Sequence, residues 1–78
     1  MSVQETEMLI DSYKKEYLRA NGRPVMAINK NGPAWIDITY SKKNGSYVQH
    51  WRAADLRRAL ETLKKRPDFN LENNLLEN

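Results

Sequence analysis

Residues Arg23–Arg52 read RPVMAINKNGPAWIDITYSKKNGSYVQHWR, and two Asn-Gly pairs divide this stretch into three short runs of sheet-forming residues. Asn-Gly is a strong hairpin signal, because a type I′ turn needs a positive φ at both central residues, which Asn tolerates and Gly adopts freely. We therefore expect an antiparallel three-stranded meander, with Asn31-Gly32 and Asn44-Gly45 as two-residue turns.

The two turns also predict which side chains share a face of the sheet, because the turn fixes the pairing register. Ile38 would lie opposite Trp51 on one side and opposite Val25 on the other. The predicted core face carries Val25, Ala27, Ile36, Ile38, Tyr40, Tyr47 and Trp51. The predicted outer face carries Met26, Ile28, Trp35, Asp37, Thr39, Val48, His50 and Arg52. In this register Asp37 and Arg52 would form a favourable cross-strand charge pair.

An amphipathic helix is expected before the meander, over residues 3–20. Ser2 and Glu5 have the spacing of a capping box, which satisfies two free backbone donors at a helix start. An apolar stripe with the 3.6-residue period follows, made of Val3, Leu9, Ile10, Tyr13, Tyr17, Leu18 and Ala20. Asn21-Gly22 supplies a left-handed residue that ends helices, and Pro24 prevents continuation.

A second helix is expected over Ala53–Arg66, because Leu56, Ala59, Leu60 and Leu63 have the spacing of a packed helical stripe. Pro67 would stop it. The order is then α-β-β-β-α, a small α+β domain in which the antiparallel meander packs against two helices. We expect one domain over residues 1–66 and an acidic C-terminal tail over residues 67–78, which would dock as a terminal turn or fray.

Composition excludes several classes of protein. The chain of 78 residues contains no cysteine, so disulfide bonds and thiolate metal sites are excluded and a reducing compartment is expected. The longest apolar run, Val25–Ile28, is far shorter than a membrane helix, and the N-terminus lacks a signal-peptide pattern. We expect a soluble protein that does not bind a membrane, in the cytoplasm of a host cell or in a virion.

Catalytic residues are scarce. The chain has one histidine, and its serines lie outside any nucleophile-elbow pattern. His50 is interpreted as a half-exposed strand residue. Each of the three glycines is explained by a turn or a helix end, so no phosphate-binding loop is predicted. The sequence therefore predicts a protein that is not an enzyme and has no cofactor, no metal ligands and no catalytic residues.

Two kinds of surface residue are candidates for binding. The apolar side chains Met26, Ile28, Trp35 and Val48 would form a patch on the outer sheet face, and such patches mark partner sites. The basic candidates are Lys42, Lys43, Arg52, Arg57, Arg58, Lys64, Lys65 and Arg66. All 13 lysines and arginines lie within residues 1–66, whereas the last twelve residues are acidic. The basic side chains would meet nucleic acid or an acidic protein surface, including the tail of the next subunit, or would simply be solvated.

Residues 4–41 and 52–66 resemble the W family of head-to-tail joining proteins of lambdoid phages. The resemblance lies in QETEMLIDSYKKEYLRANGRPV, MAINKNGPAWIDITYS and RAADLRRALETLKKR, which give a helix, a Gly-basic-Val entry, a hairpin and an Asp-Leu-led helix. Residues Lys42–Trp51 are an insertion relative to that pattern and form the third predicted strand. The resemblance implies a head-completion protein that forms a ring beneath the portal and offers a surface to the next connector component.

The α-β-β-β-α order is also that of double-stranded-RNA-binding domains, and Gly32-Pro33-Ala34-Trp35 before the second strand is similar to their pattern. Those domains grip phosphates with a Lys-Lys-led start of the last helix, where this chain has Arg52-Ala53-Ala54-Asp55. A further resemblance is to the arm-type sheet domains of phage integrases. It implies that this chain would read DNA through Trp35, His50 and the Lys42-Lys43 pair of its outer sheet face.

We therefore expect a phage-type structural or assembly protein, a head-completion or connector component that works by oligomeric packing at a portal. Its expected partners are further copies of itself and a neighbouring assembly component. The alternative is a small basic domain that binds DNA or RNA. A salt series separates the two, because contacts with phosphates weaken steeply as salt rises.

Overall fold

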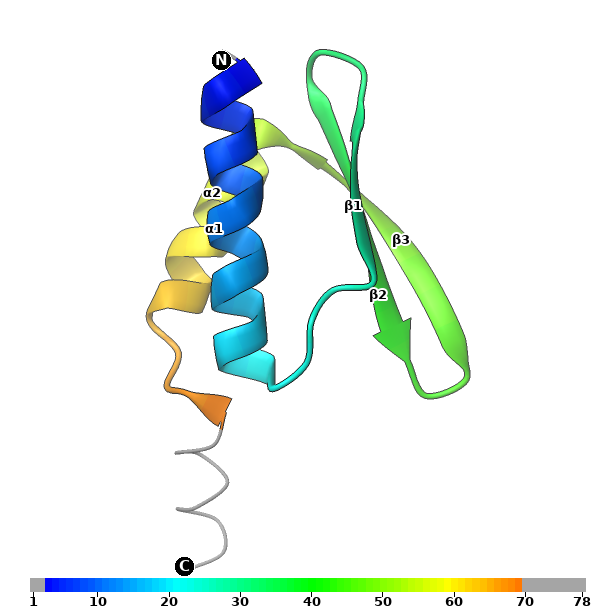
Figure 1. The fold of residues 1–78 in the computed structure, drawn as a ribbon, viewed down its shortest axis with the longest axis vertical. Coiled ribbons are helices and arrows are strands. Elements are labelled where there is room, and N and C mark those ends of the chain that lie inside the picture. Colours follow the sequence, from blue (N-terminus) through cyan, green and yellow to red (C-terminus); the bar gives the residue numbers. More distant parts are fainter. Residues whose placement is uncertain (1–2, 70–78) are drawn as a thin grey trace, which may run out of the picture.

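The computed structural model describes residues 3–69 and has two layers, one of helices and one of sheet (Figure 1). The elements are helix α1 (Val3–Asn21), strands β1 (Ala27–Asn31), β2 (Trp35–Lys42) and β3 (Gly45–Arg52), and helix α2 (Ala53–Lys64). The strands form one antiparallel sheet in the order β1-β2-β3. The predicted α-β-β-β-α order is confirmed, while the proposed Ser2 cap and most of the acidic tail lie outside the described residues.

The core lies between the sheet and the two helices, which pack on the same face of the sheet (Figure 1). Strand β2 alternates buried and less buried side chains, as a strand with one covered face does. The buried apolar residues are Leu9, Tyr13, Ala20, Val25, Ile36, Ile38, Tyr40, Leu56, Leu60 and Leu63. The stripes predicted for both helices supply six of them, so the 3.6-residue period identified most of the inner faces of α1 and α2. Leu18, which was also assigned to the α1 stripe, is 48% exposed.

The first hairpin differs from the predicted two-residue turn. Asn31 pairs with Trp35, which leaves a three-residue loop, and Gly32 in that loop has a φ of 75°. A two-residue turn at Asn31-Gly32 would have made Lys30 and Pro33 the closing pair, and proline has no backbone N–H to donate to the ladder. The loop therefore extends past Pro33, and the register of β1 moves by an odd number of residues.

This odd shift exchanges the two faces of β1. Ile28 lies opposite Ile38 and packs against the core, whereas Ala27 lies opposite Thr39 and is exposed. The prediction that Ile28 lies on the outer face and Ala27 on the core face is therefore wrong. Met26 precedes the strand and is exposed, and its backbone N–H donates a hydrogen bond to the carbonyl oxygen of Thr39 (2.8 Å).

The second hairpin also closes differently. The side chains of its strands alternate between the two sides of the sheet as predicted, but Tyr47, which was predicted in the core, is 47% exposed. Lys42 pairs with Gly45, so Lys43 and Asn44 are the central turn residues and Gly45 carries the positive φ of 143°. Because glycine takes the conformation that is costly for other residues, Asn44 keeps a negative φ. The register moves by two residues, which conserves the faces of β2 and β3. Trp51 pairs with Ile36 rather than with Ile38.

Helix α2 ends at Lys64, two residues earlier than predicted. Arg19 of α1 binds the C-terminal end of α2. The guanidinium of Arg19 donates hydrogen bonds to the carbonyl oxygens of Leu63 (2.8 Å) and Arg66 (2.7 Å). It also pairs with the carboxylates of Glu16 (2.6 Å) and Asp68 (2.8 Å). The Leu63 carbonyl belongs to the last turn of α2 and also accepts the backbone N–H of Arg66 (3.1 Å), while the Arg66 carbonyl lies just after the helix. One arginine of α1 therefore joins α1 to the last turn of α2 and to the segment that follows it.

A hydrogen-bonded set of aromatic side chains joins α1 to the sheet. The Tyr13 hydroxyl lies 2.8 Å from the Tyr40 hydroxyl, and the Trp51 Nε1–H donates to the Tyr40 hydroxyl at 3.2 Å. The Tyr17 ring centroid lies 5.5 Å from that of Tyr40. Buried polar groups are costly without partners, and here the hydroxyls of α1 and β2 satisfy each other.

These tyrosines predict a loss of stability at alkaline pH. Burial, reinforced by the hydrogen bond that the Tyr13 hydroxyl shares with Tyr40, raises the pKa of Tyr13 above its ordinary value of 10.0, and burial also raises the pKa of Tyr40. Above about pH 10 the unfolded chain releases tyrosine protons that the folded protein retains, so the free energy of unfolding falls as pH rises. Below that pH both states keep the proton and this contribution is constant.

Urea unfolding between about pH 8 and pH 11 measures this effect. The midpoint should fall more steeply above pH 10 in the wild type than in Tyr13→Phe, which lacks one of the two hydroxyls. The variant also controls for lysines that titrate in the same range. Identical slopes in the two proteins would contradict the prediction.

Candidate functional site

The outer sheet face is the side of the sheet turned away from both helices (Figure 1). The register places on this face the side chains that alternate along each strand with those pointing toward the helices. They are Ala27, Asn29, Asn31, Trp35, Asp37, Thr39, Ser41, Ser46, Val48, His50 and Arg52. No helix of the part of the chain that the structure describes covers this face. It combines apolar, polar and charged side chains on a rigid three-stranded support.

Trp35 and Arg52 form the most distinctive pair on this face. They lie directly opposite each other on β2 and β3, and the Arg52 guanidinium carbon is 5.1 Å from the centroid of the Trp35 ring. That distance allows a cation–π interaction. Trp35 is nevertheless 40% exposed, so a broad aromatic surface stays open to a partner. The structure therefore replaces the predicted Asp37–Arg52 pair with a stacked Trp35–Arg52 pair.

Asp37 instead joins the other two strands of the sheet. Its Oδ1 lies 2.6 Å from Nδ1 of His50, which is its cross-strand neighbour on β3. Its Oδ2 accepts a hydrogen bond from the Asn31 Nδ2 at 3.0 Å. Asn31, Trp35 and His50 line a shallow hollow beside these contacts. These hydrogen bonds hold the Asn31 and His50 side chains in place beside the Trp35 ring, so the hollow has both polar and aromatic walls.

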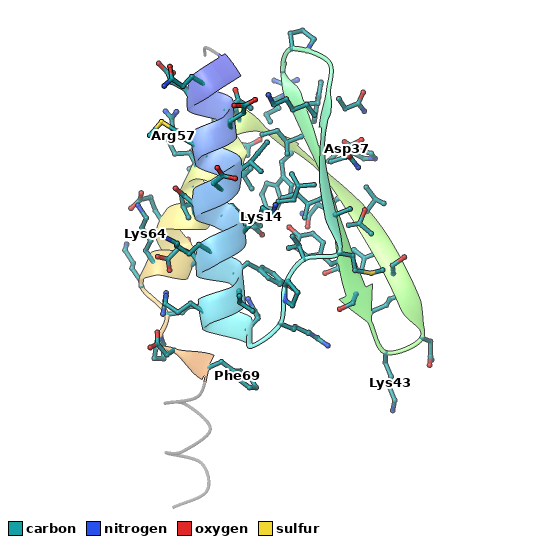
Figure 2. The ribbon with its side chains drawn as sticks, viewed as in Figure 1. Lys14, Asp37, Lys43, Arg57, Lys64 and Phe69 are labelled. Carbon is teal, nitrogen blue, oxygen red and sulfur yellow. The ribbon has the colours of Figure 1, made fainter. Side chains whose placement is uncertain are left out.

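The predicted binding residues fall into separate groups. Trp35, Val48 and Arg52 share the outer sheet face, as predicted, and Val48 is 51% exposed. Lys42 and Lys43 lie at the β2–β3 turn, and Figure 2 shows Lys43 pointing away from the body of the domain. Arg57, Arg58, Lys64, Lys65 and Arg66 are exposed on α2 and just after it.

The α2 cations lie in the other layer from the outer sheet face. Figure 2 shows Arg57 and Lys64 on the side of α2 that faces away from the sheet. Some of these cations meet carboxylates of the same helix, Arg58 with Asp55 at 3.7 Å and Lys64 with Glu61 at 3.5 Å. The structure thus does not bring the predicted basic residues together with the aromatic patch.

Residues 3–69 hold no group of three or more His, Cys, Asp or Glu side chains that could bind a metal ion. No helix within the described range is long and apolar enough to cross a membrane. No protein-family model, curated protein or solved structure matches this chain.

Proposed function

We propose that this protein is a phage-type structural or assembly protein that packs against other protein subunits through its outer sheet face. The observation that supports this most directly is the exposed Trp35 ring with Arg52 stacked on it. Tryptophan and arginine are enriched among the residues that dominate binding energy at protein interfaces. Here both are held in place by adjacent strands rather than by a loop.

The composition of the outer sheet face also favours a protein partner. Val48 and Ala27 add exposed apolar surface, while Asp37 is matched by His50. Interfaces between proteins combine an aromatic and apolar centre, poor in charge, with a polar rim. Nucleic acid instead needs a continuous basic surface, and the lysines of the hairpin turn lie apart from the arginines of α2.

The more specific proposal is a head-completion or connector component at a phage portal. It rests on the resemblance of α1, the first hairpin and α2 to the W family. Strand β3 is the departure from that pattern, because residues 45–52 form a complete strand of the sheet. The additional strand contributes Val48, His50 and Arg52 to the outer sheet face, so the proposed binding surface belongs to this chain rather than to the family.

Binding of double-stranded RNA is the second candidate. Both helices lie on one face of an antiparallel meander, and the loop before β2 contains Gly32-Pro33-Ala34, as in the resemblance described above. That mode of binding needs cations in the first turn of α2 to contact phosphates across the grooves. The first turn here contains Asp55, whose carboxylate lies 3.7 Å from Arg58. This acidic residue favours the protein-assembly proposal.

Light scattering after size-exclusion chromatography tests the proposal over a concentration series. We expect the wild type to form assemblies and Trp35→Ala to form smaller ones, because the variant removes the aromatic surface without touching the core. Met8→Ala is the matched control, since Met8 is an exposed apolar residue on α1. If Trp35→Ala assembles like the wild type, the outer sheet face is not the interface.

Filter binding of duplex RNA and duplex DNA in rising salt tests the alternative. The assembly proposal predicts no specific retention of either duplex. Tight binding that weakens steeply with salt would favour the nucleic-acid function, because each phosphate contact releases counterions. Loss of that binding in Arg57→Ala, with unchanged binding in Trp35→Ala, would assign it to α2.

A further inference from the structure

We propose that strand β3 is a dimerisation edge, at which a second copy of this chain adds its own β3 antiparallel and makes one six-stranded sheet. The inference rests on the proposed assembly function and specifies one of the partners, a second copy of the same chain. The surface involved is the edge of the sheet, which is distinct from its outer face.

Strand β3 is an unprotected edge. It ends the strand order β1-β2-β3, is eight residues long, and all its residues except Trp51 are exposed. Figure 1 shows that the β2–β3 hairpin diverges from the helices toward its tip. Natural proteins protect edge strands with charges, proline, bulges or short length. Between Gly45 and Trp51 the strand carries no proline and no Lys, Arg, Asp or Glu.

The opposite edge is protected in the usual way. Strand β1 has only five residues, and its Lys30 bears a charge that pairs with Glu7 of α1 at 3.2 Å. The sheet therefore has one edge that resists strand addition and one that invites it. A partner that adds to the sheet would do so at β3.

The sequence of β3 is compatible with a second copy of itself. In an antiparallel pair centred on Gln49, Tyr47 lies opposite the partner's Trp51 on the helix side of the sheet. Val48 lies opposite the partner's His50 on the outer face. Two-fold symmetry repeats each contact, so the pair gains two aromatic cross-strand contacts. Centring on Val48 instead would place Tyr47 opposite the partner's Gln49 and lose both.

A row of aromatic rings runs from α1 across β2 to the proposed edge, through Tyr17, Tyr40 and Tyr47. The rings of Tyr40 and Tyr47 stack with centroids 5.1 Å apart and an interplanar angle of 25°. Tyr47 is still 47% exposed, although it lies on the side of the sheet that the helices cover elsewhere. The partner's Trp51 would continue this row of rings and cover Tyr47. Arg52, the charged residue of the strand, would lie opposite the partner's Ser46, so no like charges meet.

Charge substitution at the proposed two-fold axis tests this arrangement. Gln49→Lys and Gln49→Glu each place like charges opposite each other, so each should raise the dimer dissociation constant about tenfold or more. An equimolar mixture of the two variants should recover the dimer, because the opposite charges then meet. Sedimentation velocity over a concentration series measures all three. Met8→Lys is the matched control, because it adds the same charge at an exposed residue of α1, away from both β3 and the outer sheet face.

The result separates this inference from the proposed function. Trp35→Ala should still form the β3 dimer while losing larger assemblies, and Gln49→Lys should lose the dimer. A wild type that stays monomeric, or dimers that Gln49→Lys and Gln49→Glu leave intact, would overturn the edge pairing. The outer-face proposal fails separately, if Trp35→Ala assembles like the wild type.

A disulfide trap reads the register directly. The chain contains no cysteine, so Gln49→Cys introduces one thiol per copy, and the two-fold axis would bring two of them together. Directly opposed residues of paired strands have Cβ atoms about 4.5–5.5 Å apart, close to the reach of a disulfide. Mild oxidation should give a covalent dimer of Gln49→Cys and none of Met8→Cys, whose thiol would lie on the exposed surface of α1. Cross-linking of Met8→Cys at the same rate would contradict the β3 pairing.

Discussion

Ile38→Ala should remove a large part of this domain's stability and move its urea midpoint well below that of the wild type. Ile38 is fully buried at the centre of β2, between the sheet and both helices. Truncating a buried isoleucine to alanine costs about 2–5 kcal/mol, because transfer energy is lost and a cavity remains. A domain of this length has a total stability of about 4–12 kcal/mol, so the loss is a large part of it.

Urea melts followed by circular dichroism measure the effect. Val48→Ala is the control, because Val48 lies on the neighbouring strand with its side chain on the outer sheet face. Exposed substitutions of this kind usually change stability by less than about 0.5 kcal/mol. A wild-type midpoint for Ile38→Ala would mean that the sheet does not bury the face described above.

Gly22→Ala is expected to have the second large effect, and it reports on the start of the C-terminal tail. Gly22 follows α1 with a φ of 76°, and a Cβ added there would lie 2.4 Å from the ring of Phe69. A left-handed conformation costs a non-glycine residue about 1–2 kcal/mol. Displacement of Phe69 adds to that cost. Asp68 beside it is bound to Arg19, so the segment cannot shift freely.

Two further variants separate the backbone strain from the clash. Gly32→Ala has a similar φ of 75° but no atom within 4 Å of the added Cβ, so it should show the strain alone. In a Phe69→Ala background the clash is absent. Adding Gly22→Ala to that background should therefore lower the free energy of unfolding only by as much as Gly32→Ala lowers it in the wild type. Equal losses for Gly22→Ala and Gly32→Ala would show that Phe69 does not pack on the end of α1.

Placement of Asp68 and Phe69 changes the interpretation of the tail. The sequence predicted a tail from residue 67 that docks on a partner or frays. Its first residues instead contact their own domain, through Asp68 on Arg19 and Phe69 on Gly22. The proposed charge contact between the tail and the next subunit stays a prediction, because residues 70–78 lie outside the described part of the chain.

The candidate site could be predicted only in part. Trp35, Val48 and Arg52 were assigned to one face because β2 and β3 alternate strictly, and a two-residue error in register conserves that alternation. Their partners were not predictable in the same way. The same error paired Arg52 with Asp37, whereas in the structure it stacks on Trp35.

The sequence by itself determined the order of the elements, the buried face of β2 and most of the buried faces of both helices. These features depend on local signals: apolar periodicity, Asn-Gly and Gly-Pro sequences, and prolines at helix ends. Within β1 the local signal failed, because Pro33 removed the donor that a two-residue turn would have needed.

The tertiary structure alone decided which distant groups meet. Arg19 contacts α2 across more than forty residues of sequence, and nothing in its local pattern distinguishes it from the exposed cations of the same chain. Tyr13 and Tyr40 share a hydrogen bond only because α1 lies across β2. Contacts of this kind depend on how the two layers pack, and packing is a property of side-chain shape and position in three dimensions rather than of spacing along the chain.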